Sequence, residues 1–552
     1  MRDTMKYLRN ICISLIIFIL IYNSFINILF IFNREFKSND KTFISTNTSS
    51  VFSPIGWNLN WSIFIDNISQ WSLDVGSITN NSNNDIIAGM DNGNLSIFND
   101  YKLNNSYLLD NTYQIEISLA DLNFDSEKEL IVVSGNNISV FEYNNGLSNS
   151  FLIGSNVSVF IIKDLKPESS DKLMEIIIGD NSGNVSIWQF NSNFSELSLL
   201  KSFIFTGEII SGIVSGDFTN NDKMDLAVIT ETGNLTFFHW HQQELIKLYS
   251  SLIFETSSSY EMMEFNINQD SKDEFVISDL NGNITIWEWQ YGLRLIYTGI
   301  PSSSILSLNV KDLNNDGTGE ILTGSRSGNV SIWGFYKGEL KVISSIKVNN
   351  NVTGLSAGNI DENDIMEVII GSRNNLSIYK LELADLRIEN YNVAVDQIYR
   401  GESFSVTVNI TNSGDFPAYN FTCGIYWDNT NFDYKLGASE IITYLNVNNS
   451  TQIIVEVPTD YRNTFTHTLI GRVNIYNSVL EKDISINQQR SQEVKVISFD
   501  WIWVLLMMIG ILVVIVLGIF VFPTYVEKED EEDEFKKTTV RKRKVKYKKK
   551  KR

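Results

Sequence analysis

The stretch SRSGNVSIWGF, residues 325–335, indicates the fold of this 552-residue chain. It reads as a glycine-centred turn that leads into a strand in which apolar and polar residues alternate. The pattern occurs seven times, as DNGNLSIF, SGNNISVF, NSGNVSIW, ETGNLTFF, LNGNITIW, RSGNVSIW and SRNNLSIY, and the strands open at Asn94, Asn137, Asn184, Asn234, Asn283, Asn329 and Asn375. Such repetition predicts that one structural unit is used seven times.

The spacing of these asparagines, 43 to 50 residues, is typical of a repeat that forms one four-stranded blade of a β-propeller. Each copy follows a short apolar run, such as EILTG at residues 320–324, and helical periodicity is absent. One sheet cannot bury both of its faces alone, whereas radial packing of several sheets buries them and leaves no long exposed edge. We therefore predict an all-β fold with a seven-bladed β-propeller over residues 56–383.

The Asn-Gly and Gly-Asn pairs of the repeat suit tight hairpins, because both residue types tolerate a positive φ. The same seven sites also read Asn-x-Ser/Thr, the acceptor signal for N-linked glycans. Asparagine in turns and Ser or Thr in strands produce this signal by composition alone. Turn chemistry and a glycoprotein therefore both remain open interpretations.

The repeat stops at Ala384, where short alternating strands with turns at residues 400–401 and 413–414 begin. This pattern over residues 384–497 predicts a β-sandwich. The segment RGESFSVTVNITNSGDFPAYNFTCGIYWD resembles the CARDB module, an Ig-like, adhesion-related domain of prokaryotes. Cys423 has no second thiol nearby in this region, so we expect it to pack as a small core residue.

The N-terminal segment is apolar and follows three basic residues. Residues 11–32 read ICISLIIFILIYNSFINILFIF. Such a run with a basic flank is typical of a secretory signal or of an uncleaved signal anchor. We interpret residues 1–33 as one of these two, followed by a linker at 34–55, and either choice exports the domains on its C-terminal side.

A second apolar run, WIWVLLMMIGILVVIVLGIFVF at residues 501–522, carries no charge and is long enough to cross about 30 Å of hydrocarbon as a helix. The tail at 523–552 is acidic and then strongly basic, and lysine and arginine beside a membrane helix favour the cytoplasmic side. We expect a single-pass or two-pass cell-membrane protein with a large extracellular part and a cytoplasmic C-terminus. The lysine-rich end could also contact anionic lipid.

Acidic and amide residues recur at fixed positions before five of the apolar runs. Positions 1, 3, 5 and 9 of these loops bear oxygen, an alternation that can direct ligands around a hard cation such as calcium. The same residues would also form a solvated hairpin that binds no ion. The loops are DLNFDSEKE (121–129), DFTNNDKMD (217–225), NINQDSKDE (266–274), DLNNDGTGE (312–320) and NIDENDIME (359–367).

With their apolar runs and Gly-Asn turns, these loops resemble the FG-GAP or VCBS repeats of the integrin alpha-subunit propeller and its prokaryotic relatives. The resemblance implies structural Ca²⁺ at two loops, with the ligands Asp121, Asn123, Asp125, Glu129, Asp312, Asn314, Asp316 and Glu320. It implies weaker sites at Asp217, Thr219, Asn221 and Asp225, and at Asn359, Asp361, Asn363 and Glu367. The loop at 266–274 ranks below these, and residues 77–85 and 164–175 depart further from the pattern.

The whole chain has a formal net charge of −21 although its C-terminal tail is net basic, so the exported part is strongly acidic, and an acidic surface repels nucleic acid. The chain has three histidines and lacks the HExxH, CxxC and GxSxG motifs, so we expect no enzyme. The preferred interpretation is a membrane-anchored surface binding or adhesion protein whose propeller recognises a protein or glycan. The alternatives are an extracellular propeller enzyme, polysaccharide-active or quinone-dependent, with its site at the central channel, and an envelope assembly scaffold.

Overall fold

The computed structural model describes residues 55–66, 68–78, 84–109, 115–142, 146–165, 173–241, 244–255, 259–268, 270, 272–299, 303–336, 339–361, 365–430, 434–459, 466–484, 487–497 and 505–515. The predicted signal or anchor at 1–33, the linker apart from Ile55 and the tail at 523–552 lie outside these residues. So does Asn363 among the predicted ligands.

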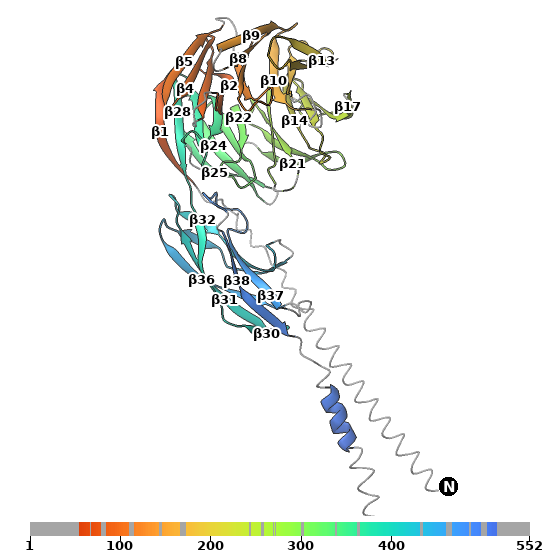
Figure 1. The fold of residues 1–552 in the computed structure, drawn as a ribbon, viewed down its shortest axis with the longest axis vertical. Coiled ribbons are helices and arrows are strands. Elements are labelled where there is room, and N and C mark those ends of the chain that lie inside the picture. Colours follow the sequence, from red (N-terminus) through yellow and green to blue (C-terminus); the bar gives the residue numbers. More distant parts are fainter. Residues whose placement is uncertain are drawn as a thin grey trace, which may run out of the picture. The chain divides into compact units, whose positions relative to one another are not determined.

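The first part of the described chain forms seven four-stranded antiparallel sheets (Figure 1). Six of them consist of four consecutive strands, and the seventh joins three consecutive strands to β1. The sheets are β2–β5 (Ile68–Gly76, Asp85–Met90, Asn94–Asn99, Lys102–Leu108), β6–β9 (Ile115–Ala120, Glu129–Ser134, Asn137–Glu142, Gly146–Leu152), β10–β13 (Val157–Lys163, Glu175–Asp180, Asn184–Phe190, Leu197–Ile204), β14–β17 (Ile210–Gly216, Asp225–Thr230, Asn234–His241, Glu244–Leu252), β18–β21 (Tyr260–Phe265, Glu274–Asp279, Ile284–Trp289, Leu293–Gly299), β22–β25 (Ile305–Lys311, Glu320–Ser325, Asn329–Tyr336, Glu339–Lys347) and β26–β28 with β1 (Val352–Gly358, Glu367–Ser372, Asn375–Glu382, Gly56–Phe64).

The sheets close into a ring. The first strand of each sheet contacts the first strand of the next, in the order β2, β6, β10, β14, β18, β22, β26 and back to β2. The strand β1 pairs antiparallel with β28, from Gly56 opposite Glu382 to Phe64 opposite Asn375, and so completes the last sheet with the beginning of the ring. This radial arrangement is a β-propeller, as the repeat predicts.

Burial differs systematically between the strands of one sheet. The second strands are buried along almost their whole length, as in β23 and β27, because both of their faces pack against neighbouring sheets. The outermost strand β17 alternates between exposed and half-buried residues. The apolar runs in the sequence are therefore the second strands, and the continuous burial explains why they do not alternate.

The turn in the quoted stretch requires glycine. Gly328 has a φ of +84°, and its amide donates to the carbonyl of Ser325 at 3.1 Å. A Cβ atom at this position would lie 2.4 Å from the carbonyl oxygen of Val348. The predicted positive φ is confirmed here, and the close approach of Val348 gives a second reason for the residue type.

The C-terminal part of the described chain is a β-sandwich whose two larger sheets have the orders β29-β31-β36 and β30-β38-β37-β33-β34, beside a β32-β35 pair. One apolar cluster joins residues of both larger sheets and includes the fully buried, unpaired Cys423, as expected. The strands are β29 (Leu386–Val393), β30 (Gln397–Tyr399), β31 (Ser403–Asn412), β32 (Ala418–Phe421), β33 (Cys423–Trp427), β34 (Lys435–Ala438), β35 (Ile442–Leu445), β36 (Ser450–Pro458), β37 (Thr466–Val473) and β38 (Gln488–Ile497).

Of the predicted membrane segment at 501–522, residues 505–515 are described, and they are helical. Their apolar side chains are exposed. No helix within the described part of the chain has both the length and the apolar character needed to span a membrane.

Candidate functional site

The loop at 312–320 connects β22 to β23 and folds around its first carboxylate. Asp312 accepts hydrogen bonds from the backbone amides of Asp316 at 3.0 Å and of Gly317 at 2.7 Å. Asp316 in turn accepts from the amide of Thr318 at 2.8 Å. These bonds are those of Asx turns, so they hold the loop without any ion.

The loop at 121–129 between β6 and β7 has the same geometry. Asp121 accepts from the amides of Asp125 at 3.0 Å and Ser126 at 2.8 Å. The side-chain amide of Asn123 donates to Asp125 at 2.9 Å. The structure therefore brings together the first three predicted ligands in both of the loops that rank highest.

The carboxylate at position 9 has a role that the ligand pattern alone does not indicate. It lies at the start of the second strand, is buried, and accepts a hydrogen bond from a backbone amide near the start of the loop; we call it the latch carboxylate. The donor is loop position 2 in six sheets and Thr219, position 3 of its loop, in the sheet of Asp225. All seven sheets contain it, at distances of 2.8 to 3.0 Å from amide nitrogen to carboxylate oxygen. The latches are Asp85, Glu129, Glu175, Asp225, Glu274, Glu320 and Glu367.

The latch occurs even where the ligand pattern is lost. Asp85 and Glu175 belong to the two loops that depart most from the pattern, yet both bind the loop backbone in the same way. The sandwich repeats the device, since the buried Glu481 accepts from the amide of Leu386 at 2.8 Å. The carboxylate that opens the second strand is therefore explained by loop closure in every sheet, whether or not an ion binds.

The residue five positions after the repeated asparagine, on the third strand, is the cross-strand neighbour of the latch, and it carries a side chain in every sheet except that of Glu320, where it is Gly334. In three sheets this neighbour is a partner for the second carboxylate oxygen: Asn99 donates to Asp85 at 2.7 Å, Gln189 donates to Glu175 at 3.0 Å, and His239 Nδ1 lies 2.6 Å from Asp225 Oδ1. These latches have both carboxylate oxygens engaged.

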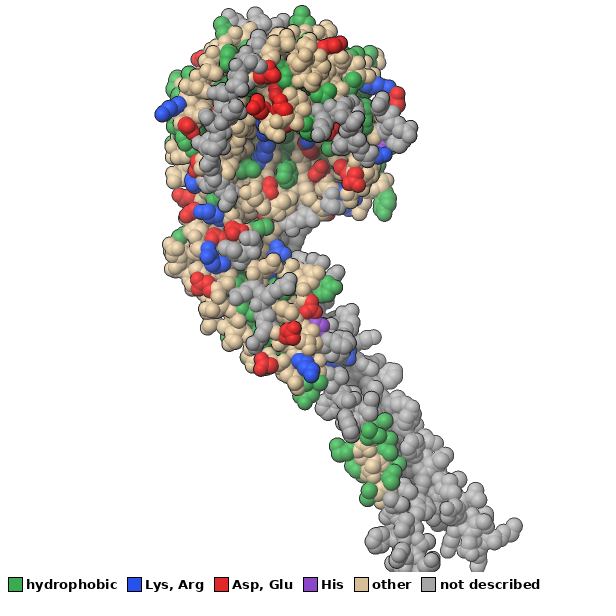
Figure 2. Space-filling model, viewed as in Figure 1, with side chains coloured by type: hydrophobic (Ala, Val, Ile, Leu, Met, Phe, Trp, Pro, Cys, Tyr) green, Lys and Arg blue, Asp and Glu red, His purple; other side chains and the backbone are tan. Residues whose placement is uncertain are grey.

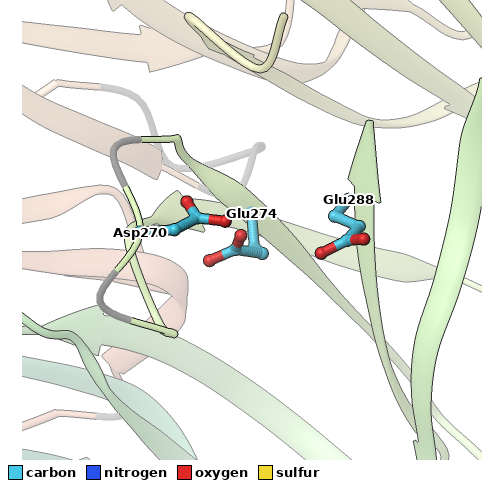
Figure 3. A group of neighbouring side chains, drawn as sticks. All are labelled: Asp270, Glu274 and Glu288. Carbon is cyan, nitrogen blue, oxygen red and sulfur yellow. The ribbon is translucent and has the colours of Figure 1, made fainter. Parts of the chain in front are cut away.

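Two sheets place a second acid at the neighbour position instead. Glu288 on β20 lies beside Glu274 and Asp270, and ligand atoms of the three carboxylates lie within 4.8 Å of one another (Figure 3). Burial, opposed by the bond from Ile267, raises the pKa of Glu274 to about 8. Arg294 Nε donates to Glu288 at 2.6 Å and supplies part of the compensating charge.

The second such sheet contains the loop at 121–129. Its neighbour residue is Glu142 on β8, and burial together with the charges of Asp125, Asp121 and Glu142 raises the pKa of Glu129 to about 7. Four acidic groups thus share one end of this sheet. A bound cation would stabilise their ionised forms.

The loop at 312–320 contains a buried oxygen without a partner. Asn314 is 3% exposed, and its Oδ1 accepts no hydrogen bond from the described residues. Burial, reinforced by Asp316 and Asp312, raises the pKa of Glu320 well above the ordinary value. A buried acceptor without a donor is costly, and a cation among these side chains would satisfy it.

The carboxylates of the two weaker predicted sites have protein partners, although Thr219 Oγ1 at 217–225 is, like Asn314 Oδ1, a buried oxygen without a hydrogen bond among the described residues. At 217–225, Asp225 accepts from the amide of Thr219 at 3.0 Å and contacts His239, while Asp217 accepts from the amides of Asn221 at 2.9 Å and Asp222 at 2.7 Å.

At 359–367, Glu367 binds the amide of Ile360, and Asp361 forms an ion pair with Lys380 at 3.5 Å. The lysine takes the neighbour position on β28 and supplies a positive charge there. The backbone carbonyl of Asn359 accepts a hydrogen bond from the side chain of Asn84 at 2.6 Å.

A cavity of about 380 Å³ lies among the first strands of the sheets, at the centre of the ring. Its lining combines apolar side chains with the acids Asp74, Glu116, Glu261 and Glu264 and the lysines Lys128, Lys163 and Lys311. Figure 2 shows a hollow on one face of the ring with acidic and basic side chains in and around it. The sequence favours this channel as the place for an enzyme site but singles out none of these residues.

Simple positional rules would find the residues that the motifs miss. Glu142 and Glu288 lie five residues after the repeated asparagines Asn137 and Asn283, and Glu116 lies five residues before the first residue of its loop. Their importance depends on which strands are neighbours, which the repeat alone does not establish.

Comparison with known proteins identifies one domain. Residues 383–491 match the CARDB family. This segment is a CARDB domain. The match agrees with the sandwich predicted at 384–497, and the CARDB domain ends within β38.

Solved structures also resemble the chain at low identity. BBS1N in complex with ARL6DN, from a crystal soaked with lead, is 15% identical to this chain, with a TM-score of 0.48 over 60% of this chain and 97% of that one. The same complex soaked with mercury is 15% identical, with a TM-score of 0.47 over 59% of this chain and 97% of that one. Raptor from Chaetomium thermophilum is 13% identical with a TM-score of 0.45, over 60% of this chain and 29% of that one. No curated protein sequence matches the chain.

Proposed function

We propose that this chain is a membrane-anchored cell-surface binding or adhesion protein, whose ring of sheets is a seven-bladed, FG-GAP-like propeller that recognises a protein or glycan outside the cell. The observation that carries the proposal is the order of its parts. A closed propeller precedes a CARDB domain, and the apolar segment at 501–522 and a basic tail come after that domain. This order fits a recognition domain on a stalk that a membrane helix anchors.

The surface of the propeller supports a binding role. Acidic side chains are spread over the visible face of the ring with basic side chains among them (Figure 2), and the loops with most acidic side chains lie between first and second strands. Loops at one end of a rigid ring are a common place for binding residues, because the strands fix their positions while their sequences vary. This location favours recognition of a partner that carries basic or hydrogen-bonding groups.

Calcium would be a structural component of two of these loops. The residues at 312–320 fit it, because the unpartnered Asn314 Oδ1 is buried beside Asp312, Asp316 and Glu320. Those at 121–129 fit it through the acids that share one end of the sheet. When bound, the ion would compensate carboxylates whose burial otherwise favours their protonated forms. The loop backbone is held by the Asx turns and the latch in either state.

An extracellular enzyme is the second candidate, because the central cavity holds titratable groups. Neither His239 nor His467 lines this cavity, so the titratable groups of its lining are carboxylates and lysines. Each of these histidines places Nδ1 2.6 Å from an aspartate oxygen, of Asp225 and Asp428 respectively. Absorbance spectra of the purified chain would reveal a quinone cofactor. A visible chromophore in stoichiometric amount would favour this candidate over adhesion.

The binding proposal is tested with cells that display the full chain on their surface. Adhesion of these cells to arrays of glycans and of purified surface proteins is compared with that of cells displaying a chain without residues 56–383. We expect retention on a subset of array positions that requires the propeller. Equal retention of both cell types at every position would refute recognition by the propeller for the ligands on the array.

A further inference from the structure

A second cavity of about 380 Å³ lies against the sheet β22–β25 and reaches its outermost strand, β25. Its lining contains the indole of Trp333 and a single charged side chain, Lys347, and no carboxylate belongs to its described lining. In a chain with a net charge of −21, a cavity of this charge stands apart from the acidic loops. The hydroxyl and amide groups of the lining belong to Ser303, Thr323, Ser325, Asn329, Ser331 and Ser345.

The strand register places the polar groups of this cavity side by side. Ser331 on β24 lies opposite Ser345 on β25, and Asn329, two residues before Ser331, lies opposite Lys347. Directly opposite residues have Cβ atoms about 4.5–5.5 Å apart, and residues two positions apart on a strand are separated by about 7 Å. These four side chains are therefore within reach of one small ligand.

A hydroxyl group occupies the position of Ser331 in all seven sheets, two residues after the repeated asparagine. In five sheets the protein itself satisfies this hydroxyl. Three of these hydroxyls bond one on the outermost strand, in the pairs Ser139 and Ser150 at 2.7 Å, Thr236 and Ser250 at 2.9 Å, and Ser377 and Ser62 at 3.2 Å. Two accept from an indole of their own strand, Ser186 from Trp188 at 2.8 Å and Thr285 from Trp287 at 2.9 Å.

The sheet β22–β25 departs from this rule although its third strand also carries an indole. Trp333 Nε1 donates to Thr323 on β23 at 2.9 Å and not to Ser331. The side chains of Ser331 and Ser345 make no hydrogen bond with any described residue. Two adjacent hydroxyl groups beside an indole are thus available to a ligand.

One other sheet leaves this hydroxyl unbonded among the described residues, at Ser96 opposite Ser106. There Phe98 takes the place of the indole and Leu108 takes the place of the lysine. The combination of free hydroxyl groups, indole and positive charge therefore occurs in the sheet β22–β25, and the sheet β2–β5 provides a natural comparison for it.

We propose that this cavity binds a short acidic saccharide, whose carboxylate contacts Lys347 and whose hydroxyl groups bond Ser331 and Ser345. Serine hydroxyls both donate and accept, so they match sugar hydroxyls in either direction. Trp333 offers an apolar surface on which a sugar ring can pack. The volume lies within the range of small-molecule sites. The proposal rests on the proposed binding function and names a ligand class and a site for it.

The test titrates digalacturonate calorimetrically into the purified full chain. The chain is made in a host without N-glycosylation, because Asn329 also begins a glycan acceptor signal. The dimethyl ester of the probe is the neutral sugar, and diglutamate is the acid without a sugar. We expect saturable binding of digalacturonate, binding of the ester that is weaker by about fivefold, and no binding of the peptide.

Two variants on the exposed positions of β25 locate the site. Lys347→Gln removes the charge, so it should weaken binding of digalacturonate about fivefold and leave binding of the ester unchanged. Ser345→Phe fills the cavity and should abolish binding of both sugars. Lys102→Gln and Ser106→Phe, the same changes at exposed positions of β5, are the matched controls and should alter neither affinity.

Absence of digalacturonate binding to the wild type would overturn the proposal, as would unchanged binding in a folded Ser345→Phe variant. Equal affinity for the probe and its ester would overturn the role of Lys347, and equal affinity for diglutamate would overturn recognition of a sugar. Cells displaying Ser345→Phe separate this site from the wider function. If they keep every propeller-dependent contact on the array, this site is refuted while recognition by the propeller stands.

Discussion

The latch of the loop at 312–320 can be separated from its proposed ion with two substitutions at Glu320. Glu320→Ala removes the acceptor of the Leu313 amide and leaves a buried donor unsatisfied, which costs about 1–3 kcal/mol. Glu320→Gln keeps an acceptor and removes the charge. Since burial already disfavours the ionised form of Glu320, we expect the Gln variant to lie within about 1 kcal/mol of the wild type in chelator.

Calcium then distinguishes the two roles. A site with a dissociation constant of about 10⁻⁴ to 10⁻³ M would be stabilised by about 0.4–1.4 kcal/mol at about 1 mM calcium. The wild type should gain this amount, whereas Glu320→Gln should lose most of it. Glu175→Gln is the control, because its loop lacks the ligand pattern and Gln189 already occupies its second oxygen.

The measurement is hydrogen exchange by mass spectrometry on peptides that cover residues 312–320 of the full chain. In chelator, exchange in Glu320→Ala should be about 5- to 150-fold faster than in the wild type, corresponding to 1–3 kcal/mol. Unchanged exchange in the Ala variant would refute the latch. Identical exchange of the wild type with and without calcium would refute the ion while leaving the latch intact.

Other predictions concern the turn, the pH dependence and the sandwich. Gly328→Ala should destabilise the chain by about 1–2 kcal/mol or more, because it forces an alanine to a positive φ and places its Cβ against the carbonyl oxygen of Val348. A free energy of unfolding in urea equal to that of the wild type would contradict this. Burial raises the pKa of Glu129 to about 7 and that of Glu274 to about 8. Without calcium, the contribution of these two groups to the free energy of unfolding should therefore be highest below about pH 4.5 and should fall as the pH rises to about 8. The slope should reach at most about 1.4 kcal/mol per group and pH unit. Calcium should flatten that slope if it binds these loops, which urea titrations at several pH values would measure. In the sandwich, Glu481 accepts a hydrogen bond from the amide of Leu386 without an acidic loop beside it, and burial raises its pKa to about 8. The Glu481→Gln variant should therefore reduce the same dependence of stability on pH equally with calcium and with chelator.

The sequence predicts the parts of this fold that have a local cause. Gly328 must adopt a positive φ, and the residues after Asn329 must alternate, so the turn and the third strands can be read directly. The apolar runs mark the second strands because those are buried on both faces. The strand β17 carries only a weak alternation, and the pairing of β1 with β28 joins residues more than 300 positions apart, so neither has a local signal.

The candidate site was less predictable, for a physical reason. A carboxylate at the start of the second strand suits an ion ligand and a backbone latch equally well. The two roles are separated by the bonds that Asp85 and Glu175 accept from the backbone of loops without the ligand pattern. The residue opposite the latch on the third strand is informative only once the strand register is known. It is His239 opposite the latch Asp225, but the acid Glu288 beside the latch Glu274. Glu116 carries no motif, and its place in the central cavity depends on the closed ring.

Exposure of the propeller on the cell surface is the claim on which the proposed function depends, and protease treatment of intact cells tests it most directly. Cells that produce the full chain with a C-terminal tag are treated with protease, and the propeller and the tag are detected by immunoblot. If residues 34–498 lie outside and 524–552 inside, protease should remove the propeller and spare a short tagged fragment. Survival of an intact propeller on sealed cells whose known surface proteins are digested, or loss of the tag while cytoplasmic markers persist, would contradict this topology.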